Sequence, residues 1–336
     1  MPTGQALSTR LPVVLHSAPL VAPMESEPVR GGAVAVRGDR VLRVGPRREL
    51  LSRYEVAEEI HWRGLIVPGL VDAFATAPVT GVTTRAGLSG PDLRYLDVRC
   101  PSEQAWEEHE RDALITAIRE AEQPVGVAAH SPDPAVQEDL AILARTFGLR
   151  LLADLERHPL EALDDAGILG PHCHVACSGR LGPGERKLLR LRRVVPAFHG
   201  DGDPLPLFDD GEPVALSLPL AGTLRRARPT QAGRLVEALT LVPARALGLG
   251  HGPGRVGSLG PGSRADLAVF DARGRHPYSA LLDQAPCLGT VRGGLAGAGT
   301  LPGDLVPGKR RRGPRDVRGP DGMHREAEAG RADPRR

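Results

Sequence analysis

Residues 64–73 read Gly-Leu-Ile-Val-Pro-Gly-Leu-Val-Asp-Ala. The apolar run Leu65–Val67 has the length of a short buried strand, and Pro68-Gly69 ends it. Before this stretch, short apolar runs alternate with turns; after it, they alternate with amphipathic helical patterns. The stretch therefore marks the boundary between an all-β segment and an α/β segment.

The segment before this boundary is predicted to be a small β unit. Arg37-Gly38-Asp39-Arg40 lies between two apolar runs, and its Gly-Asp pair predicts a hairpin turn. The runs that we interpret as strands cover residues 11–20, 32–36, 41–44, 59–62 and 65–67.

The segment after the boundary is predicted to contain βα units, because strand patterns alternate with longer amphipathic patterns. The predicted strands cover residues 125–129, 150–153, 172–178 and 213–218. The predicted helices cover residues 102–122, 134–147, 158–166, 184–193 and 230–247. Residues 256–271 return to strands and turns. This order predicts a parallel sheet flanked by β structure from both chain ends.

Charge is unevenly distributed along the chain. The net charge of +2, from 43 basic and 41 acidic residues, argues against a nucleic-acid binder that uses its whole surface. Residues 305–336 are basic and poor in apolar side chains, so a disordered tail is expected there. Nucleic acid is an expected partner only through this tail, and a plain solvated tail is the favoured interpretation.

Composition also indicates the compartment. Four cysteines in 336 residues do not form a disulfide framework, which favours a reducing environment. No apolar run reaches the roughly 18 residues that a membrane-spanning helix needs. We therefore expect a cytoplasmic protein with no membrane partner.

A second stretch, residues 257–271, reads Gly-Ser-Leu-Gly-Pro-Gly-Ser-Arg-Ala-Asp-Leu-Ala-Val-Phe-Asp and follows a helical pattern at Pro243–Leu249. Together with residues 64–73 it resembles the amidohydrolase superfamily of metal-dependent hydrolases and deaminases. The most similar groups are imidazolonepropionase and the deaminases of cytosine and aminodeoxyfutalosine. The resemblance implies a (β/α) barrel with a small composite β-sandwich built from both chain ends, an α/β plus β architecture.

The resemblance also gives domain boundaries. The sandwich is expected to take residues 10–68 and 246–304, the barrel residues 69–245, and the basic tail residues 305–336. A complete barrel typically takes about 250 residues and rarely fewer than about 200. The barrel is therefore expected to be shortened or incomplete.

The family's chemistry needs a divalent metal, zinc or iron, held by histidines and an aspartate at strand ends, which makes a hydroxide nucleophile at neutral pH. By the resemblance, the ligand positions here carry residues that do not match the family: Phe74, Thr76, Ala128, Cys177 and Pro219. Ser131 replaces the usual acid. Because only Cys177 among the five could bind a metal tightly, no metal cofactor is expected.

A few other residues are weak metal candidates. His130 lies two residues beyond Ala128, on the same face of a predicted strand, and His172-Cys173-His174 precedes Cys177. In a strand the two histidines face away from the two cysteines, so this cluster cannot converge on one ion unless it forms a loop. A structural role for these side chains is favoured.

Three functional hypotheses follow. The first is a catalytically degenerate relative of enzymes that hydrolyse non-peptide carbon–nitrogen bonds, which binds a related small molecule or an active homologous partner. The second is an active hydrolase or deaminase with displaced ligands, which requires three side chains to meet at one point from among His130, His172, His174, His199 and Cys177. The third is a binding module that acts through the basic tail.

Overall fold

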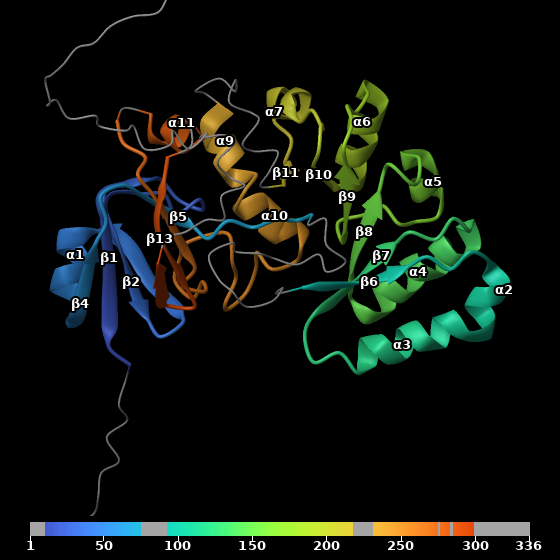
Figure 1. The fold of residues 1–336 in the computed structure, drawn as a ribbon, viewed down its shortest axis with the longest axis horizontal. Coiled ribbons are helices and arrows are strands. Elements are labelled where there is room, and N and C mark those ends of the chain that lie inside the picture. Colours follow the sequence, from blue (N-terminus) through green and yellow to red (C-terminus); the bar gives the residue numbers. More distant parts are fainter. Residues whose placement is uncertain (1–10, 75–92, 218–230, 275, 283–284, 299–336) are drawn as a thin grey trace, which may run out of the picture.

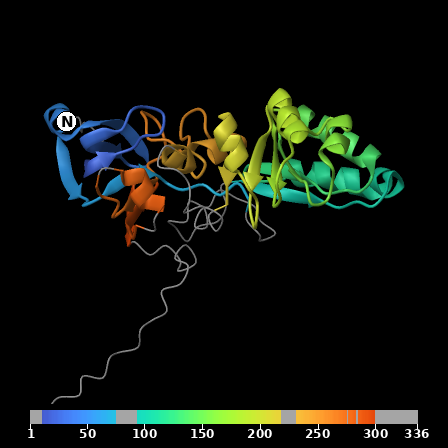
Figure 2. The same ribbon diagram turned by 90° about the horizontal axis from the view of Figure 1, so that it is seen from above.

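The computed structural model describes residues 11–74, 93–217, 231–274, 276–282 and 285–298. These residues form two sheets at opposite ends of an elongated molecule (Figure 1, Figure 2). Two short helices, α9 (Ala232–Glu237) and α10 (Leu241–Ala246), lie between the sheets.

The first sheet is mixed and takes strands from both ends of the chain. Its path runs β14-β13-β12-β5-β1-β2-β3, and β4 pairs with β1 outside this path. The strands are β1 (Val13–Val21), β2 (Val29–Arg37), β3 (Arg40–Pro46), β4 (Val56–His61), β5 (Leu65–Pro68), β12 (Leu267–Phe270), β13 (Cys287–Arg292) and β14 (Leu295–Ala298). The predicted hairpin joins β2 to β3, and its Gly38 has a φ of +56°.

The two chain ends meet where β5 pairs antiparallel with β12, with Leu65 opposite Phe270. On its other side β5 runs parallel to the end of β1. The four residues of β5 are all buried, as their apolar sequence predicts. This one strand therefore joins the N-terminal strands to the C-terminal strands.

The second sheet is wholly parallel, and its strands follow one another in chain order. They are β6 (Arg94–Val98), β7 (Val125–Ala129), β8 (Arg150–Asp154), β9 (Cys173–Cys177), β10 (Val195–Phe198) and β11 (Ala215–Leu216). Within the described ranges, β6 and β11 form its two edges.

Helices connect the strands of this sheet, and their ends carry the expected signals. Asp133 caps α4 by accepting hydrogen bonds from the N–H groups of Ala135 and Val136, and Gly148 ends it at a φ of +66°. These connecting helices are α2 (Glu103–Ala105), a π-helical turn at Trp106–Glu110, α3 (Arg111–Arg119), α4 (Pro134–Phe147), α5 (Leu160–Asp165), α6 (Pro183–Arg192) and α7 (Leu205–Asp210). Two further helices lie between strands of the mixed sheet: α1 (Arg47–Arg53) between β3 and β4, and α11 (Pro277–Leu282) between β12 and β13.

The parallel sheet is covered on both faces. Val127, Leu151 and Val175 belong to a large core that includes residues of the connecting helices. The alternate positions, such as Ala128 and Leu152, pack in a separate core. The partners on this second, inner face come from segment 70–74, from α10 and from the turns after it: Val71, Ala73, Ala244, Leu247 and Val256.

The structure confirms the coarse prediction of a parallel α/β sheet together with β structure from both chain ends, which forms a mixed sheet. The single helix predicted over residues 230–247 is wrong, because α9 and α10 are separate helices. The strand predicted over residues 213–218 is only two residues long in the described part of the chain. Strands β6 and β10 were not predicted at all.

Several expectations stay predictions. They are the shortened or incomplete barrel, the small composite β-sandwich built from both chain ends, and the boundaries of the four segments. The basic tail at 305–336 lies outside the described residues. Among the helices that the structure describes, none combines the length and apolar character needed to cross a bilayer.

Gly64 lies where β5 enters the mixed sheet, and a Cβ atom there would collide with the backbone of Phe270 and Asp271. We expect Gly64→Ala to destabilise the fold by about 1–3 kcal/mol, because backbone atoms cannot move aside as a flexible side chain would. Urea unfolding of the whole chain measures the change. Gly184→Ala in α6, where a Cβ meets nothing within 4 Å, is the matched control and should be neutral or stabilising. Equal effects of the two substitutions would contradict this account.

Candidate functional site

Several titratable side chains on the inner face of the parallel sheet lie at its carboxyl edge. In parallel α/β sheets this edge is where ligands bind. Alternation along the strands places Asp97 at the end of β6, His130 just after β7 and Asp154 at the end of β8. His199 follows β10, where its N–H donates to the carbonyl of Cys177.

Asp97 and His130 form a hydrogen-bonded pair across neighbouring strands. His130 Nδ1 lies 2.7 Å from Asp97 Oδ1, and the other carboxylate oxygen accepts a hydrogen bond of 2.8 Å from Arg99 Nε. The strand register explains the contact, because Val98 pairs with Ala129 and the His130 N–H donates to the Val98 carbonyl.

Phe74 occupies the first predicted ligand position and stacks on His199. The ring centroids lie 4.1 Å apart with 20° between the planes. Burial lowers the pKa of His199, while the negative charges of Glu156 and Asp154 oppose that shift. An apolar ring therefore contacts a neutral imidazole at the first position for which the sequence resemblance predicted a metal ligand.

The other predicted site residues that the structure describes are buried in the core or hydrogen-bonded within the protein. Ala128 is buried on the inner face, and Cys177 faces the opposite core. Burial raises the pKa of the Cys177 thiol to about 11, which disfavours the thiolate that would bind a metal. Ser131 is buried and donates to the carbonyl of Cys100. Thr76 and Pro219 lie outside the described residues.

His174 is a satisfied core histidine. Its Nε2 lies 3.2 Å from the carbonyl oxygen of Ala73, so that nitrogen carries the proton, and Nδ1 can accept a weak hydrogen bond from the Tyr95 hydroxyl at 3.5 Å. Burial lowers the pKa of His174 to about 3. Because both ring nitrogens contact polar groups of the protein and the side chain is fully buried, it is not free to bind a metal.

The five histidine and cysteine candidates do not meet. His172 precedes β9 at the amino edge of the sheet, whereas His130 and His199 lie at the carboxyl edge, after β7 and β10. Two strands, β8 and β9, separate those two histidines within the sheet. Within the ranges that the structure describes, no three His, Cys, Asp or Glu side chains are placed to hold a metal ion. The described residues do not fit the zinc or iron that the sequence resemblance implies.

Sequence reasoning missed Asp97, Asp154 and His158. Asp154 accepts a hydrogen bond from the N–H of Glu156 and contacts Arg157 at 3.4 Å. His158 Nδ1 accepts a hydrogen bond of 3.2 Å from the Gln137 side chain. Recognising β6 as a strand would have placed Asp97 at the same edge as His130.

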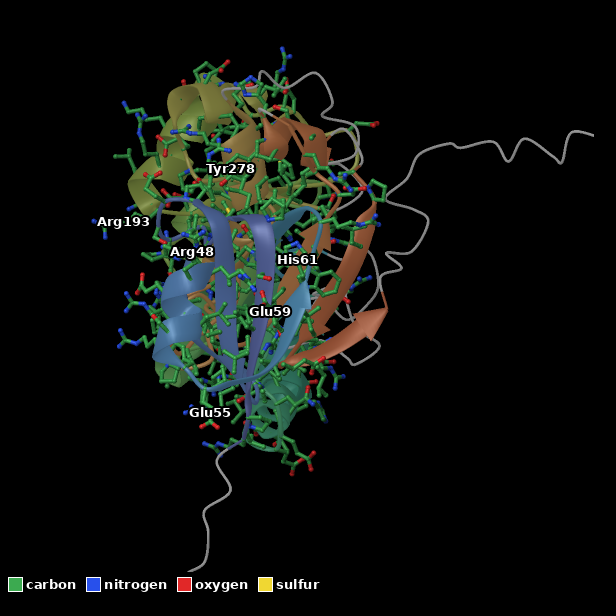
Figure 3. The ribbon with its side chains drawn as sticks, turned by 90° about the vertical axis from the view of Figure 1, so that its left-hand side faces the viewer. Arg48, Glu55, Glu59, His61, Arg193 and Tyr278 are labelled. Atoms are coloured by element: carbon green, nitrogen blue, oxygen red, sulfur yellow. The ribbon has the colours of Figure 1, made fainter. Side chains whose placement is uncertain are left out.

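Two other clusters lie on or beside the mixed sheet. Ser17 Oγ donates to Glu59 at 2.5 Å and lies 3.1 Å from His61 Nδ1; Figure 3 shows Glu59 and His61 on β4. Arg47 hydrogen-bonds Glu59 and is the main cause that lowers the pKa of Glu59 to about 2. Ser17 is buried and gives its proton to a carboxylate, not to the histidine, so it is not an activated nucleophile.

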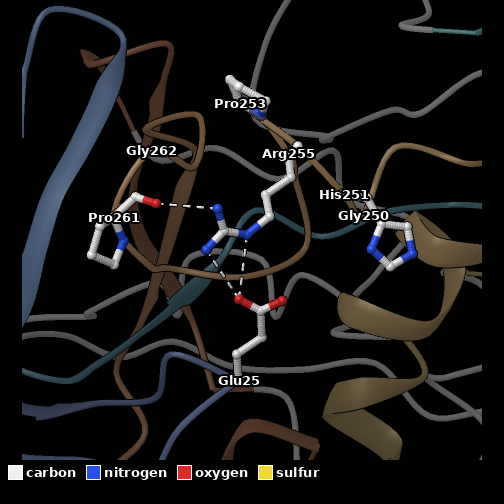
Figure 4. A pocket seen from close by; sticks show the side chains of 8 residues that line it. Glu25, Gly250, His251, Pro253, Arg255, Pro261 and Gly262 are labelled. Carbon is white, nitrogen blue, oxygen red and sulfur yellow. Dashed lines mark hydrogen bonds and ion pairs between the residues drawn. The ribbon is translucent and has the colours of Figure 1, made fainter.

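The second cluster lines a cavity of about 490 Å³ formed by the glycine-rich turn after α10 (Figure 4). Arg255 crosses this cavity but is occupied by Glu25 at 3.3 Å and by the carbonyl of Pro261 at 3.1 Å. The charge of Arg255 is therefore neutralised by the protein itself. Unlike the carboxyl edge of the parallel sheet, this cavity has, among the described residues, no cluster of polar side chains that strands hold in place.

Several solved structures superpose on most of the chain. An adenosine deaminase from Xanthomonas campestris, with bound zinc, superposes with a TM-score of 0.66 at 16% identity, over 85% of this chain and 93% of that one. Aminofutalosine deaminase from Helicobacter pylori gives 0.64 at 13% identity, over 85% and 100%. Atrazine chlorohydrolase from Arthrobacter aurescens gives 0.60 at 16%, over 84% and 94%.

The chain has an amidohydrolase fold. The resemblance drawn from residues 64–73 and 257–271 is confirmed at that level. In addition, residues 32–54 match the model of the bacterial imidazolonepropionase-like composite domain. No curated protein matches the chain at the level of sequence. Within this amidohydrolase fold, the carboxyl-edge site combines the Asp97–His130 pair, Asp154 and the Phe74–His199 stack.

The buried His174 predicts a dependence of stability on pH. Its folded-state pKa of about 3 lies below its ordinary value of 6.5, so between these values the unfolded chain binds a proton that the folded chain does not. The free energy of unfolding should therefore fall as pH falls from about 6.5, by up to about 1.4 kcal/mol per pH unit for this ring. Urea unfolding at several pH values should show a shallower slope for His174→Gln. The exposed His109→Gln is the control, and identical slopes for all three proteins would refute the assignment.

Proposed function

We propose that this chain binds a small nitrogen heterocycle at the carboxyl edge of its parallel sheet and does not catalyse metal-dependent hydrolysis. The observation that carries the proposal is the stacking of Phe74 on His199 at 4.1 Å. A position that the family uses to hold a metal instead presents an aromatic face, beside carboxylates that can accept hydrogen bonds.

The chemistry of the fold neighbours supports the choice of ligand. Their names designate enzymes that act on adenosine, aminofutalosine and atrazine, all of which contain amino-substituted nitrogen heterocycles. Such rings are flat, polarisable and rich in N–H donors. Aromatic side chains bind flat bases by stacking, at about 1–3 kcal/mol per base in nucleic-acid complexes.

The loss of hydrolytic chemistry follows from residue types. Phe74 and Ala128 have no lone pair that could bind a metal, and the Cys177 thiol faces the opposite core. Hydrolysis of a carbon–nitrogen bond in this family needs a metal-activated water, and a catalytic zinc needs about three protein ligands. We therefore propose a catalytically degenerate relative of the hydrolases, in which the ligand stays chemically unchanged.

We further propose that the barrel is reduced. Six parallel strands run in chain order, and α10 packs against the inner face of β10 and β11. A barrel of eight strands fills its interior with side chains from facing strands. Here Ala244 and Leu247, from α10 and its end, join that inner core. The mixed sheet would be the remnant of the composite sandwich.

Metal content tests the degenerate centre directly. The purified, untagged chain should contain far less than one equivalent of zinc or iron by inductively coupled plasma mass spectrometry, because the described residues supply no three-ligand group. It should also leave adenosine and atrazine unchanged over a long incubation. Stoichiometric metal together with turnover of either compound would overturn the proposal.

Substitution of the stacking ring tests the ligand site. We expect Phe74→Ala to weaken the binding of adenosine about fivefold to tenfold in isothermal titration calorimetry, because a stacked aromatic pair contributes about 0.5–1.5 kcal/mol. Phe147→Ala, at the far end of α4, removes a phenyl ring away from the edge and should leave the affinity unchanged. If both substitutions weaken binding equally, the ligand does not contact Phe74.

A further inference from the structure

The ring of His130 is held in one orientation by its neighbours. Asp97 contacts Nδ1 at 2.7 Å, and Arg99 fixes the second oxygen of the same carboxylate at 2.8 Å. The backbone is held as well, since the His130 N–H donates to the Val98 carbonyl. These contacts join His130, just after β7, to the end of the neighbouring strand β6, so the orientation of the ring is set by the parallel sheet.

The partner of Nδ1 determines which ring nitrogen carries the proton. An ionised carboxylate can only accept a hydrogen bond, so in the neutral ring the proton lies on Nδ1. The other nitrogen, Nε2, must then present a lone pair. The Asp97 side chain therefore turns Nε2 of His130 into a hydrogen-bond acceptor.

This acceptor is buried and unused within the protein. Among the described residues, His130 Nε2 has no hydrogen-bond partner and almost no exposed surface. The side chain as a whole is 12% exposed. A buried polar atom without a partner costs free energy, so it is retained only when something else compensates. A ligand that donates an N–H group at this edge would supply the missing hydrogen bond.

Most of the polar groups around His130 are hydrogen-bonded to other parts of the protein. Gln137 donates both to the Ser131 carbonyl and to His158 Nδ1, and Ser131 is bonded to the Cys100 carbonyl. His158 Nε2, in the neighbouring ring, has no hydrogen-bond partner among the described residues either, and no hydrogen bond joins it to His130 Nε2. Asp154, from the next strand, accepts from the Glu156 N–H and faces Arg157.

We infer that His130 Nε2 is the hydrogen-bond acceptor that recognises an N–H donor on the bound ring, with Asp97 as the positioning residue that fixes the tautomer. The inference rests on the proposed function and assigns one specific contact within it. It predicts a preference for rings with an exocyclic amine over rings that carry only acceptors on the same edge. Adenosine and 6-methoxypurine riboside form such a pair of probes.

Asp97→Asn tests the tautomer without removing the side chain. Arg99 can only donate, so the carboxamide oxygen should face Arg99 and its NH₂ group should face His130. His130 Nδ1 then becomes an acceptor, and the proton moves to Nε2. The ring nitrogen shifts of His130, measured by ¹⁵N NMR at about pH 8, should exchange their pattern in this variant.

Binding provides the second measurement. We expect the wild-type chain to bind adenosine about tenfold or more tightly than 6-methoxypurine riboside, because the second probe leaves Nε2 without a donor. In Asp97→Asn this preference should vanish or reverse. His130→Leu should remove the preference without reversing it. The matched control is Asp164→Asn. It alters a carboxylate on α5 that is paired with Arg192 on α6, and it should behave as the wild type.

The outcomes separate this inference from the proposed function. If the wild-type chain binds neither probe, the proposed function fails and the inference fails with it. If both probes bind but Asp97→Asn leaves their ratio unchanged, ring binding stands and the assignment of His130 is wrong. An Nε2-protonated ring in the wild-type protein would also overturn the assignment.

Discussion

The pairing of β5 with β12 is the constraint on which the rest of the structure depends. Leu65–Pro68 is hydrogen-bonded to β1 on one side and to β12 on the other. Immediately afterwards the Gly69 N–H donates to the Asp266 carbonyl and the Val71 N–H to the Leu239 carbonyl. These bonds direct residues 70–74 onto the inner face of the parallel sheet. The position of Phe74 beside His199 is thus a consequence of strand pairing far from the site.

Within the site, the replaced residues change the balance between charge and apolar surface. A metal centre would place a strong positive charge among the carboxylates at the strand ends. Here Asp97 is instead neutralised by Arg99 and Asp154 by Arg157, both in partly exposed contacts. Phe74, Ala128 and Leu152 make the inner face of the sheet next to these carboxylates apolar. The edge therefore combines locally compensated charges with an apolar floor, a surface suited to a neutral, flat ligand.

Much of this architecture could be predicted from local sequence. The β2–β3 hairpin follows from Gly38-Asp39, and α4 follows from Asp133, its apolar periodicity and Gly148. Strand β6 was missed because Arg94 and Asp97 interrupt its apolar pattern, and β10 because it contains Pro196. Asp97 belongs to the candidate site only through the pairing of β6 with β7, which no local pattern in the sequence indicates.

The shared mixed sheet also bears on how the protein folds during synthesis. Strands β1 to β5 leave the ribosome long before β12, yet β5 is completed only by that later strand. Until then one edge of β5 stays open, and such an edge can pair with another chain. Contacts so distant in sequence are slow to form. The edge of β5 that faces β12 therefore has no native partner until all residues of the parallel sheet have been synthesised.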